Sequence, residues 1–255
     1  MIVFDDAALE STIPLLIAGV TTFAGQFCMA GSRILVQSGI ADQVRRQLRE
    51  RLERVVVGRG EEETSQMGPL IDRAAVTRVD RIVEEASHYS HIVFRGGPVN
   101  EGPLAAGAFY RPSLLEVSDL GSLIIQQEVF GPVATFEVFA DEAEAIHRAH
   151  ATEFGLAAAL FTHDDDRARR VSRQIEAGTV WTNTWFSVND GFEEGGYKRS
   201  GIGRLRGPHG LAAFHESRPM SSLCHRPDLD GPGPHLTAVP VDGSSTDVLR
   251  TRVVH

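Results

Sequence analysis

The clearest structural pattern in the sequence is a run of five segments: VATFEVF (133–139), ADEAEAIHRAH (140–150), LAAALF (156–161), DDDRARRVSRQIEA (164–177) and TVW (179–181). The three short apolar segments predict strands, whereas the two longer, charge-rich segments predict helices. Strands and helices that alternate at this spacing are typical of an α/β domain with a largely parallel sheet flanked by helices. The uninterrupted apolar run 156–161 is typical of a strand that is covered on both faces.

The first half of the chain carries further elements of both kinds. We expect strands at 2–4, 34–36, 92–94 and 109–117, and helices at 7–23, 42–55 and 73–87. Pro14 should kink or break the first helix, and Pro112 should interrupt the last strand. Gly96 and Gly97 should stop the strand at 92–94. In the second half, Asp164 should cap the helix at 164–177, and Gly178 should lie at its C-terminal end.

The end of the chain has a different composition. Residues 228–245 are rich in proline, glycine, aspartate and serine and lack periodicity. We therefore predict one folded domain at 1–215 and a disordered, flexible tail at 226–255.

The composition disfavours several classes of binding partner. A net charge of −9 disfavours nucleic-acid binding, which needs a basic face. No apolar run approaches the ~20 residues that span a bilayer, so we expect no membrane partner. The ten histidines lack metal-ligand spacing, which predicts no metal site. The two cysteines form no CxxC pair, and the first residues lack the positive charge of a secretory signal; both features favour the cytoplasm.

Cys28 is the candidate nucleophile. It lies in GQFCMAGSR (25–33), between a predicted helix and a predicted strand, where flanking glycines favour an exposed bend. A thiolate there could attack a carbonyl carbon. Composition alone favours the alternative, because a single cysteine beside apolar residues is more often part of the core.

Six motifs occur in one order along residues 1 to about 225: IVFDDAALE (2–10), GQFCMAGSR (25–33), QEVFGPV (127–133), FGLAA (154–158), GTVWTN (178–183) and GGYKRSGIGR (195–204). In this order they resemble the aldehyde dehydrogenase superfamily, specifically its C-terminal half, which carries the catalytic cysteine. The resemblance implies the catalytic-domain fold of that family for residues 1–215.

The resemblance also implies roles for individual residues. Cys28 matches the thiol that attacks the aldehyde, and its backbone N–H would supply half of an oxyanion hole. Hydride would pass to a nicotinamide, with NAD as the expected cofactor and NADP left open, and water would cleave the resulting thioester. Glu128 matches the glutamate that binds the nicotinamide-side ribose, and Phe130 matches an aromatic beside the cofactor. A surface glutamate and an ordinary core phenylalanine are the structural alternatives.

Asn183 and Trp185 follow the strand at 179–181, and open parallel sheets bind ligands at the carboxyl ends of their strands. The loop 185–194 could therefore line the aldehyde entrance. The family resemblance makes Trp185 and Phe186 the candidates for substrate contact. Ordinary packing is the alternative for both side chains.

The matched motifs leave out the family's N-terminal, nucleotide-binding half. That half carries the glutamate that activates water and the asparagine that completes the oxyanion hole. Loss of single groups of this kind costs about 10²–10⁴-fold in rate, so we expect the chain alone not to oxidise aldehydes usefully.

Three functions stay open. The chain could work when another chain supplies the missing half, as a homo-oligomer or bound to a full-length or N-terminal-half family member. It could be a non-catalytic remnant or oligomer-interaction module, with residues 216–225 as a candidate oligomerisation strand. It could also be a cysteine hydrolase that uses Cys28.

Overall fold

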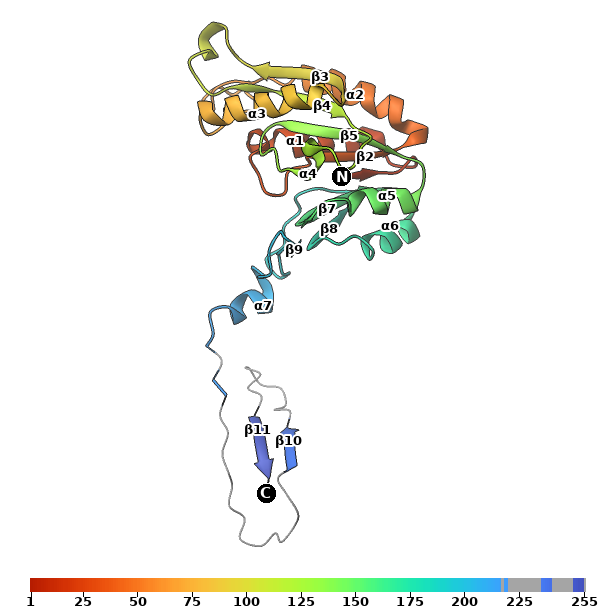
Figure 1. Cartoon of the computed structure of the whole chain (residues 1–255), viewed down its shortest axis with the longest axis vertical. Helices are drawn as coiled ribbons and strands as arrows, with labels where there is room; N and C mark the ends of the chain where they lie inside the picture. The colour runs from red at the N-terminus through yellow and green to blue at the C-terminus, as the bar shows by residue number, and fades with distance from the viewer. Residues whose placement is uncertain (217, 220–234, 240–249, 255) are drawn as a thin grey trace.

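The computed structural model describes residues 1–216, 218–219, 235–239 and 250–254 (Figure 1). Its main feature is a seven-stranded sheet with the order β3-β4-β5-β2-β1-β7-β8. The strands are β1 (Ile2–Val3), β2 (Arg33–Gln37), β3 (His91–Pro98), β4 (Tyr110–Glu116), β5 (Val133–Phe139), β7 (Ala157–Phe161) and β8 (Thr179–Thr182). Neighbouring strands in this sheet run parallel except β3 and β4, which are antiparallel. The predicted α/β class with a largely parallel sheet is confirmed.

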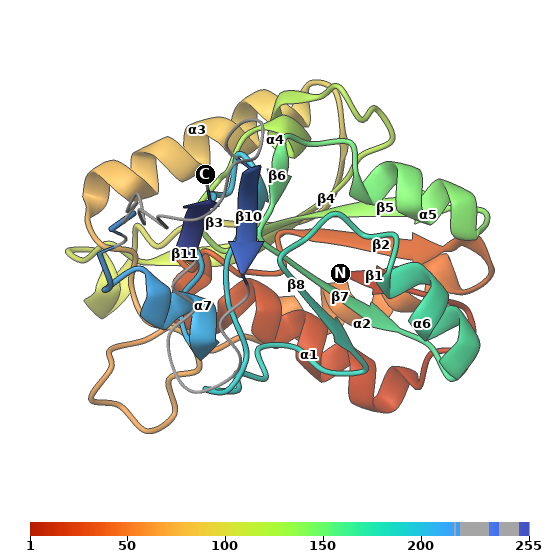
Figure 2. The same ribbon diagram turned by 90° about the horizontal axis from the view of Figure 1, so that it is seen from below.

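Helices cover both faces of the sheet, as Figure 2 shows. Helices α1 (Leu9–Thr21) and α2 (Ala41–Glu53) lie on one side, and α3 (Arg73–Ser87), α5 (Glu142–Ala149) and α6 (Asp165–Ser172) lie on the other. Strand side chains alternate between the two layers. In β2, Ile34 and Val36 pack in the cluster with α1 and α2, whereas Leu35 packs in the cluster with α5 and α6. The sheet is therefore buried on both faces, as the apolar strands predicted.

Pro14 does not break the helix, because α1 continues through this residue, whereas a kink at Pro14 stays a prediction. Pro14 lacks the N–H that would bond the carbonyl of Glu10. It lies on the exposed side of the helix, where water can satisfy that carbonyl. The opposite face, with Ile13, Leu16 and Val20, is buried and holds the helix in place.

Two predicted strand interruptions were also wrong. β3 continues through Gly96, because β4 passes so close that a Cβ on Gly96 would lie 2.3 Å from the carbonyl oxygen of Pro112. β4 continues through Pro112, because this residue has no partner in the register with either neighbour: the pairs with β3 pass from Arg111 to Ser113, and the pairs with β5 begin at Ser113. The close approach requires glycine at position 96, and the N–H that proline lacks is not needed for either register.

Helix α6 is shorter than predicted. Asp164 caps it as expected, since its carboxylate accepts from the N–H groups of Asp166 and Arg167, but the helix ends at Ser172. Gly178 therefore does not cap it. This glycine instead lies against the backbone of Gly195, whose carbonyl oxygen would be 1.6 Å from an added Cβ.

Several described elements had no clear signal in the sequence. They are α4 (Leu123–Gln126), α7 (Gly207–Ala212), the antiparallel pair β6 (Phe154–Gly155) and β9 (Tyr197–Lys198), the antiparallel pair β10 (His235–Val239) and β11 (Arg250–Val254), and the 3-10 turns η1 (Thr22–Gly25), η2 (Ser38–Ile40) and η3 (Gly102–Leu104). The predicted oligomerisation strand (216–225) and flexible tail (226–255) fall mostly outside the described residues. Strands β10 and β11 are the parts of that predicted tail for which the backbone is described.

Candidate active site

A cleft of about 390 Å³ opens at the amino ends of the parallel strands. Its lining includes Cys28, Glu128 and Trp185, together with strand-start residues such as Arg33 and Ala157. The expectation that the site lies at the carboxyl ends of the strands was therefore wrong for this cleft. The loops that enter β2 and β5 carry Cys28 and Glu128, so the side chains collect where these strands begin.

The strand order explains why Cys28 and Glu128 share the cleft. Cys28 stands five residues before β2, and Glu128 stands five residues before β5. β2 and β5 are parallel neighbours, with Arg33 opposite Thr135. Their preceding loops must then lie side by side, although the two residues are 100 positions apart in the sequence.

Cys28 occupies the corner of a tight turn. The N–H of Ala30 donates to the carbonyl of Phe27 over 3.0 Å, which closes the turn around Cys28 and Met29. The side chain of Met29 is buried, whereas Cys28 is exposed. The structure therefore excludes the core-cysteine alternative and places the residue on an exposed bend, as the flanking glycines predicted.

The chain ahead of this turn is strained. Phe23, Ala24 and Gly25 have φ values of 51°, 55° and 68°, a left-handed conformation that L side chains adopt at a cost of roughly 1–2 kcal/mol per residue. Glycine is required at position 25, because an added Cβ would lie 2.2 Å from the carbonyl oxygen of Gly131. The loop of Cys28 thus packs directly on the backbone of the loop that carries Glu128.

The Glu128 loop connects α4 to β5 and is held by helix α3. Arg78 donates from Nη1 to the carbonyl of Val129 over 2.6 Å and from Nη2 to the carbonyl of Phe130 over 3.2 Å. Phe130 has a φ of 49°, so these bonds stabilise a left-handed residue two positions after Glu128. Glu128 itself is exposed and faces the cleft, where its carboxylate can accept hydrogen bonds.

Phe130 and Phe186 lie outside the described lining of the cleft. Both rings are half-exposed, at 40% and 39% of their full area. Phe130 is therefore not the simple core residue that was its alternative. Its packing beside a cofactor stays a prediction, as does contact between Phe186 and a substrate.

Aromatic rings gather beside Cys28. The ring of Phe27 lies 4.8 Å from Phe186, 5.5 Å from Phe23 and 6.2 Å from Trp185, measured between centroids. The indole Nε1 of Trp185 donates to the carbonyl of Met29 over 3.0 Å. The loop after β8 thus returns from the carboxyl end of the sheet to the turn of Cys28.

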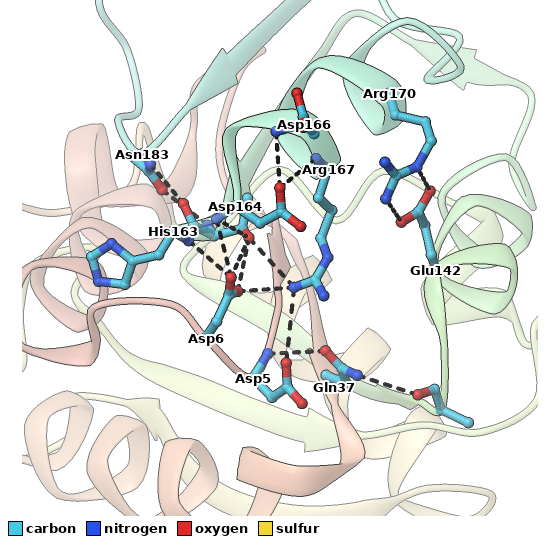
Figure 3. A network of polar contacts seen from close by, with 12 residues as sticks. Asp5, Asp6, Gln37, Glu142, His163, Asp164, Asp166, Arg167, Arg170 and Asn183 are labelled. Carbon is cyan, nitrogen blue, oxygen red and sulfur yellow. Dashed lines mark hydrogen bonds and ion pairs between the residues drawn. The ribbon is translucent and has the colours of Figure 1, made fainter.

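Asn183 lies elsewhere, in the polar network of Figure 3. Its side-chain oxygen accepts from the N–H of Thr162 over 3.0 Å, and its amide nitrogen donates to the carbonyl of Thr162 over 2.9 Å. The neighbouring carboxylate of Asp6 accepts from the Thr162 hydroxyl over 2.8 Å and from Nη1 of Arg167 over 3.0 Å. This network joins the carboxyl ends of β1, β7 and β8, so the amide of Asn183 has a structural role.

A buried ion pair lies beneath the cleft. Arg33 makes two hydrogen bonds of 2.7 Å to the carboxylate of Glu137, which is fully buried. Arg33 also donates to the carbonyl of Arg148 over 2.9 Å, and its own carbonyl accepts from the amino group of Met1 over 2.6 Å. These bonds connect the starts of β1 and β2 to the middle of β5 at the base of the cleft.

Sequence reasoning missed Arg78 and the pair of Arg33 and Glu137. The second had a detectable signal, because a glutamate inside the otherwise apolar strand VATFEVF must have a buried partner. No sequence signal pointed to Arg78, because it is one of several charged residues on a predicted amphipathic helix.

Among the residues that the structure describes, no group of three His, Cys, Asp or Glu side chains is placed to hold a metal ion. None of the helices in the same residues is long and apolar enough to cross a membrane.

Comparison with known proteins gives a consistent result. A sequence model of the aldehyde dehydrogenase family matches residues 1–219. The betaine aldehyde dehydrogenase of Sinorhizobium fredii is 40% identical over 205 residues, which are 80% of this chain and 42% of that protein. The succinate-semialdehyde dehydrogenase of Paenarthrobacter nicotinovorans is 36% identical over 213 residues, or 84% of this chain and 47% of that protein.

Solved structures agree with the sequence comparison. The betaine aldehyde dehydrogenase of Staphylococcus aureus, crystallised with NAD⁺, superposes with a TM-score of 0.80 at 37% sequence identity. The match covers 84% of this chain and 42% of the crystallised one. The chain therefore spans less than half the length of these relatives.

Proposed function

The chain belongs to the aldehyde dehydrogenase family, and from this premise we propose that it supplies the nucleophile half of an NAD-dependent aldehyde dehydrogenase. One observation carries the proposal: a single cleft contains the exposed thiol of Cys28 and the exposed carboxylate of Glu128. The family's reaction requires a nucleophile at the aldehyde and a group that binds the cofactor beside it.

In this reaction the thiolate of Cys28 attacks the aldehyde carbon. A C–S bond forms, and the carbonyl π electrons move to oxygen, which the backbone N–H of Cys28 stabilises in part. NAD, when bound, accepts the hydride from the former aldehyde carbon. Water then cleaves the thioester at Cys28, which releases the carboxylic acid and returns the thiol.

Glu128 fits the cofactor role by its chemistry. An exposed carboxylate accepts hydrogen bonds from the vicinal hydroxyls of a ribose, and Arg78 holds the backbone next to Glu128. We propose that Phe130 packs beside the same part of the cofactor. The NAD⁺ complex of the S. aureus relative supports NAD over NADP.

On the substrate side we propose that Trp185 and Phe186 contact the aldehyde. Both rings lie within 6.2 Å of Phe27, the residue before Cys28. The printed names of the relatives make betaine aldehyde and succinate semialdehyde the first compounds to test.

We further propose that a second chain completes the site. Phe23 and Ile71 are 65% and 81% exposed, and the N–H of Ile71 bonds Gln26 in the Cys28 loop. Apolar side chains at this position favour an adjoining protein surface. That surface would belong to a nucleotide-binding half, in a homo-oligomer or in a complex with another family member, and we place the complex in the cytoplasm.

The test uses the purified chain, its Cys28→Ser variant and the nucleotide-binding half of the S. fredii relative. With NAD and either aldehyde, we expect no NADH from the chain alone. We expect NADH from the mixture of both halves, and none when Cys28 is replaced by serine. NADH formation by the serine variant at the wild-type rate would refute the proposal.

The same samples separate the other functions. An activated phenyl ester should acylate the chain once, at Cys28, which peptide mass spectrometry locates. Many turnovers of this ester would instead favour a cysteine hydrolase. Absence of both acylation and NADH would favour the non-catalytic interaction module, and light scattering would then report its oligomeric state.

A further inference from the structure

Trp185 joins the turn of Cys28 to a loop that is anchored independently. Its indole Nε1 donates to the carbonyl of Met29, the residue after Cys28, over 3.0 Å. The ring of Trp185 also lies against Phe27, the residue before Cys28, with 6.2 Å between centroids. Trp185 therefore contacts the residues on both sides of the nucleophile.

The loop that presents Trp185 is fixed at two other points. The indole Nε1 of Trp181 donates to the carbonyl of Ser187 over 2.8 Å, which closes the loop on itself. Asn183 has a left-handed φ of 53°, and its amide makes two hydrogen bonds to the backbone of Thr162. These anchors hold the loop independently of the Cys28 turn, so the hydrogen bond from Trp185 can fix the position of that turn.

The Cys28 turn needs an anchoring contact of this kind. It follows three left-handed residues, 23–25, and strained backbone persists only where the surroundings hold it. The hydrogen bond from Ala30 to Phe27 closes the turn but does not connect it to the sheet. The bond from Trp185 provides that connection on the side of β8.

We propose that Trp185 is a positioning residue for Cys28: its indole N–H holds the Met29 carbonyl and keeps the thiol at the corner of the turn, facing the cleft. This inference rests on the proposed role of Cys28 as the nucleophile. It assigns to Trp185 a function in addition to substrate contact. This function depends on the indole N–H group alone.

The test compares the full chain with Trp185→Phe, which keeps an aromatic ring and removes the N–H. Ser90→Ala is the matched control, because it removes a 2.6 Å side-chain hydrogen bond to the carbonyl of Ala86, and neither residue lines the cleft. The first measurement is hydrogen exchange of the peptide containing residues 27–31. We expect faster exchange in Trp185→Phe and unchanged exchange in Ser90→Ala.

The second measurement is acylation of Cys28 by an activated phenyl ester. The sulfur forms a bond to the acyl carbon, the phenolate leaves, and the thiol proton passes to solvent. We expect Trp185→Phe to react about tenfold more slowly, which corresponds to one hydrogen bond of ordinary net strength. Alkylation by iodoacetamide needs only an accessible thiol, so it should change less than about twofold.

The outcomes test the positioning role of Trp185 and the nucleophile role of Cys28 separately. Unchanged exchange in Trp185→Phe would overturn the proposal, and so would faster exchange with acylation at the wild-type rate. Equal slowing of acylation and alkylation would also overturn it, since a general loss of structure would then be the cause. If the wild-type chain is not acylated at Cys28, the proposed function fails, whereas the exchange data still decide whether Trp185 holds the turn.

Discussion

At the scale of single residues, the stability of the fold should depend strongly on the buried carboxylate of Glu137. It is fully buried and accepts two hydrogen bonds of 2.7 Å from Arg33, while the hydroxyl of Thr135 lies 3.2 Å away. A second guanidinium, from Arg148, stands 3.9 Å from it. Arg148 also pairs with Glu144 over 2.9 Å, so Arg33 is the arginine that depends on the Glu137 carboxylate for charge compensation at the base of the cleft.

We predict that Glu137→Gln lowers the free energy of unfolding by about 3–5 kcal/mol, because it leaves buried positive charge without a partner. Urea unfolding followed by circular dichroism measures the loss. Asp166→Asn is the control, since its pair with Arg169 is exposed on both sides, at 83% and 65%, and solvent screening should leave it with little effect on stability. Similar losses in both variants would contradict this account of the ion pair.

At the scale of elements, the loops that enter β2 and β5 act as one unit. Gly25 of the first loop packs on the backbone of Gly131 in the second, and Gly131 packs in turn on Val79 of α3. Arg78 of the same helix bonds two carbonyls of the second loop. Helix α3 therefore supports the positions of both Glu128 and Cys28.

We predict that Gly25→Ala is much more destabilising than Gly97→Ala. Both glycines have left-handed φ values, 68° and 76°, so both substitutions carry the strain of roughly 1–2 kcal/mol. Only at Gly25 would the Cβ meet backbone, 2.2 Å from the carbonyl oxygen of Gly131, whereas a Cβ on Gly97 meets no atom within 4 Å. The clash should add about 1–3 kcal/mol to the loss.

Urea unfolding of the two glycine variants measures this difference, and acylation by the activated ester reports the position of Cys28. We expect Gly25→Ala to lose acylation and Gly97→Ala to keep it. Equal stability of the two variants would mean that the loops do not pack as closely as the distances indicate.

At the scale of the whole molecule, paired carboxylates govern the response to acid. A hydrogen bond from Arg170 lowers the pKa of Glu142 below its usual 4.5, and a hydrogen bond from Arg95 does the same for Glu84. The pKa of Asp164 is lowered chiefly by the backbone N–H of Arg167. All three groups bind protons less readily in the folded chain than in the unfolded chain.

We predict that stability falls as the pH drops below about 4.5, the ordinary value for glutamate. Depressed carboxyl pKa values stabilise the fold above the unfolded pKa, and this contribution is lost as the pH falls through the folded pKa. Urea midpoints between neutral pH and pH 3 measure the decline. Arg170→Ala should reduce its steepness, because the pKa of Glu142 would return toward the unfolded value, and an unchanged profile would contradict the assignment.

Most of the fold was predictable from local sequence. The apolar pattern placed β5 and α3 at their observed bounds, because the side chains of one segment decide which face can be buried. The errors at Pro14, Gly96 and Pro112 have a common cause, which is tertiary context. Pro14 lies on an exposed side of its helix, the neighbouring strand approaches closely at Gly96, and Pro112 stands where neither register has a pair; none of these conditions is visible in a single segment.

The sequence by itself determined the α/β class and singled out Cys28, Glu128, Phe130, Trp185 and Phe186. Tertiary structure decided which of them meet. The pairing of β2 with β5 brought Cys28 and Glu128 into one cleft at the amino ends of the strands, and the returning loop brought Trp185 to the same place. The physical reason is that strand order and loop path depend on packing between distant segments, whereas periodicity reports only the faces of each segment.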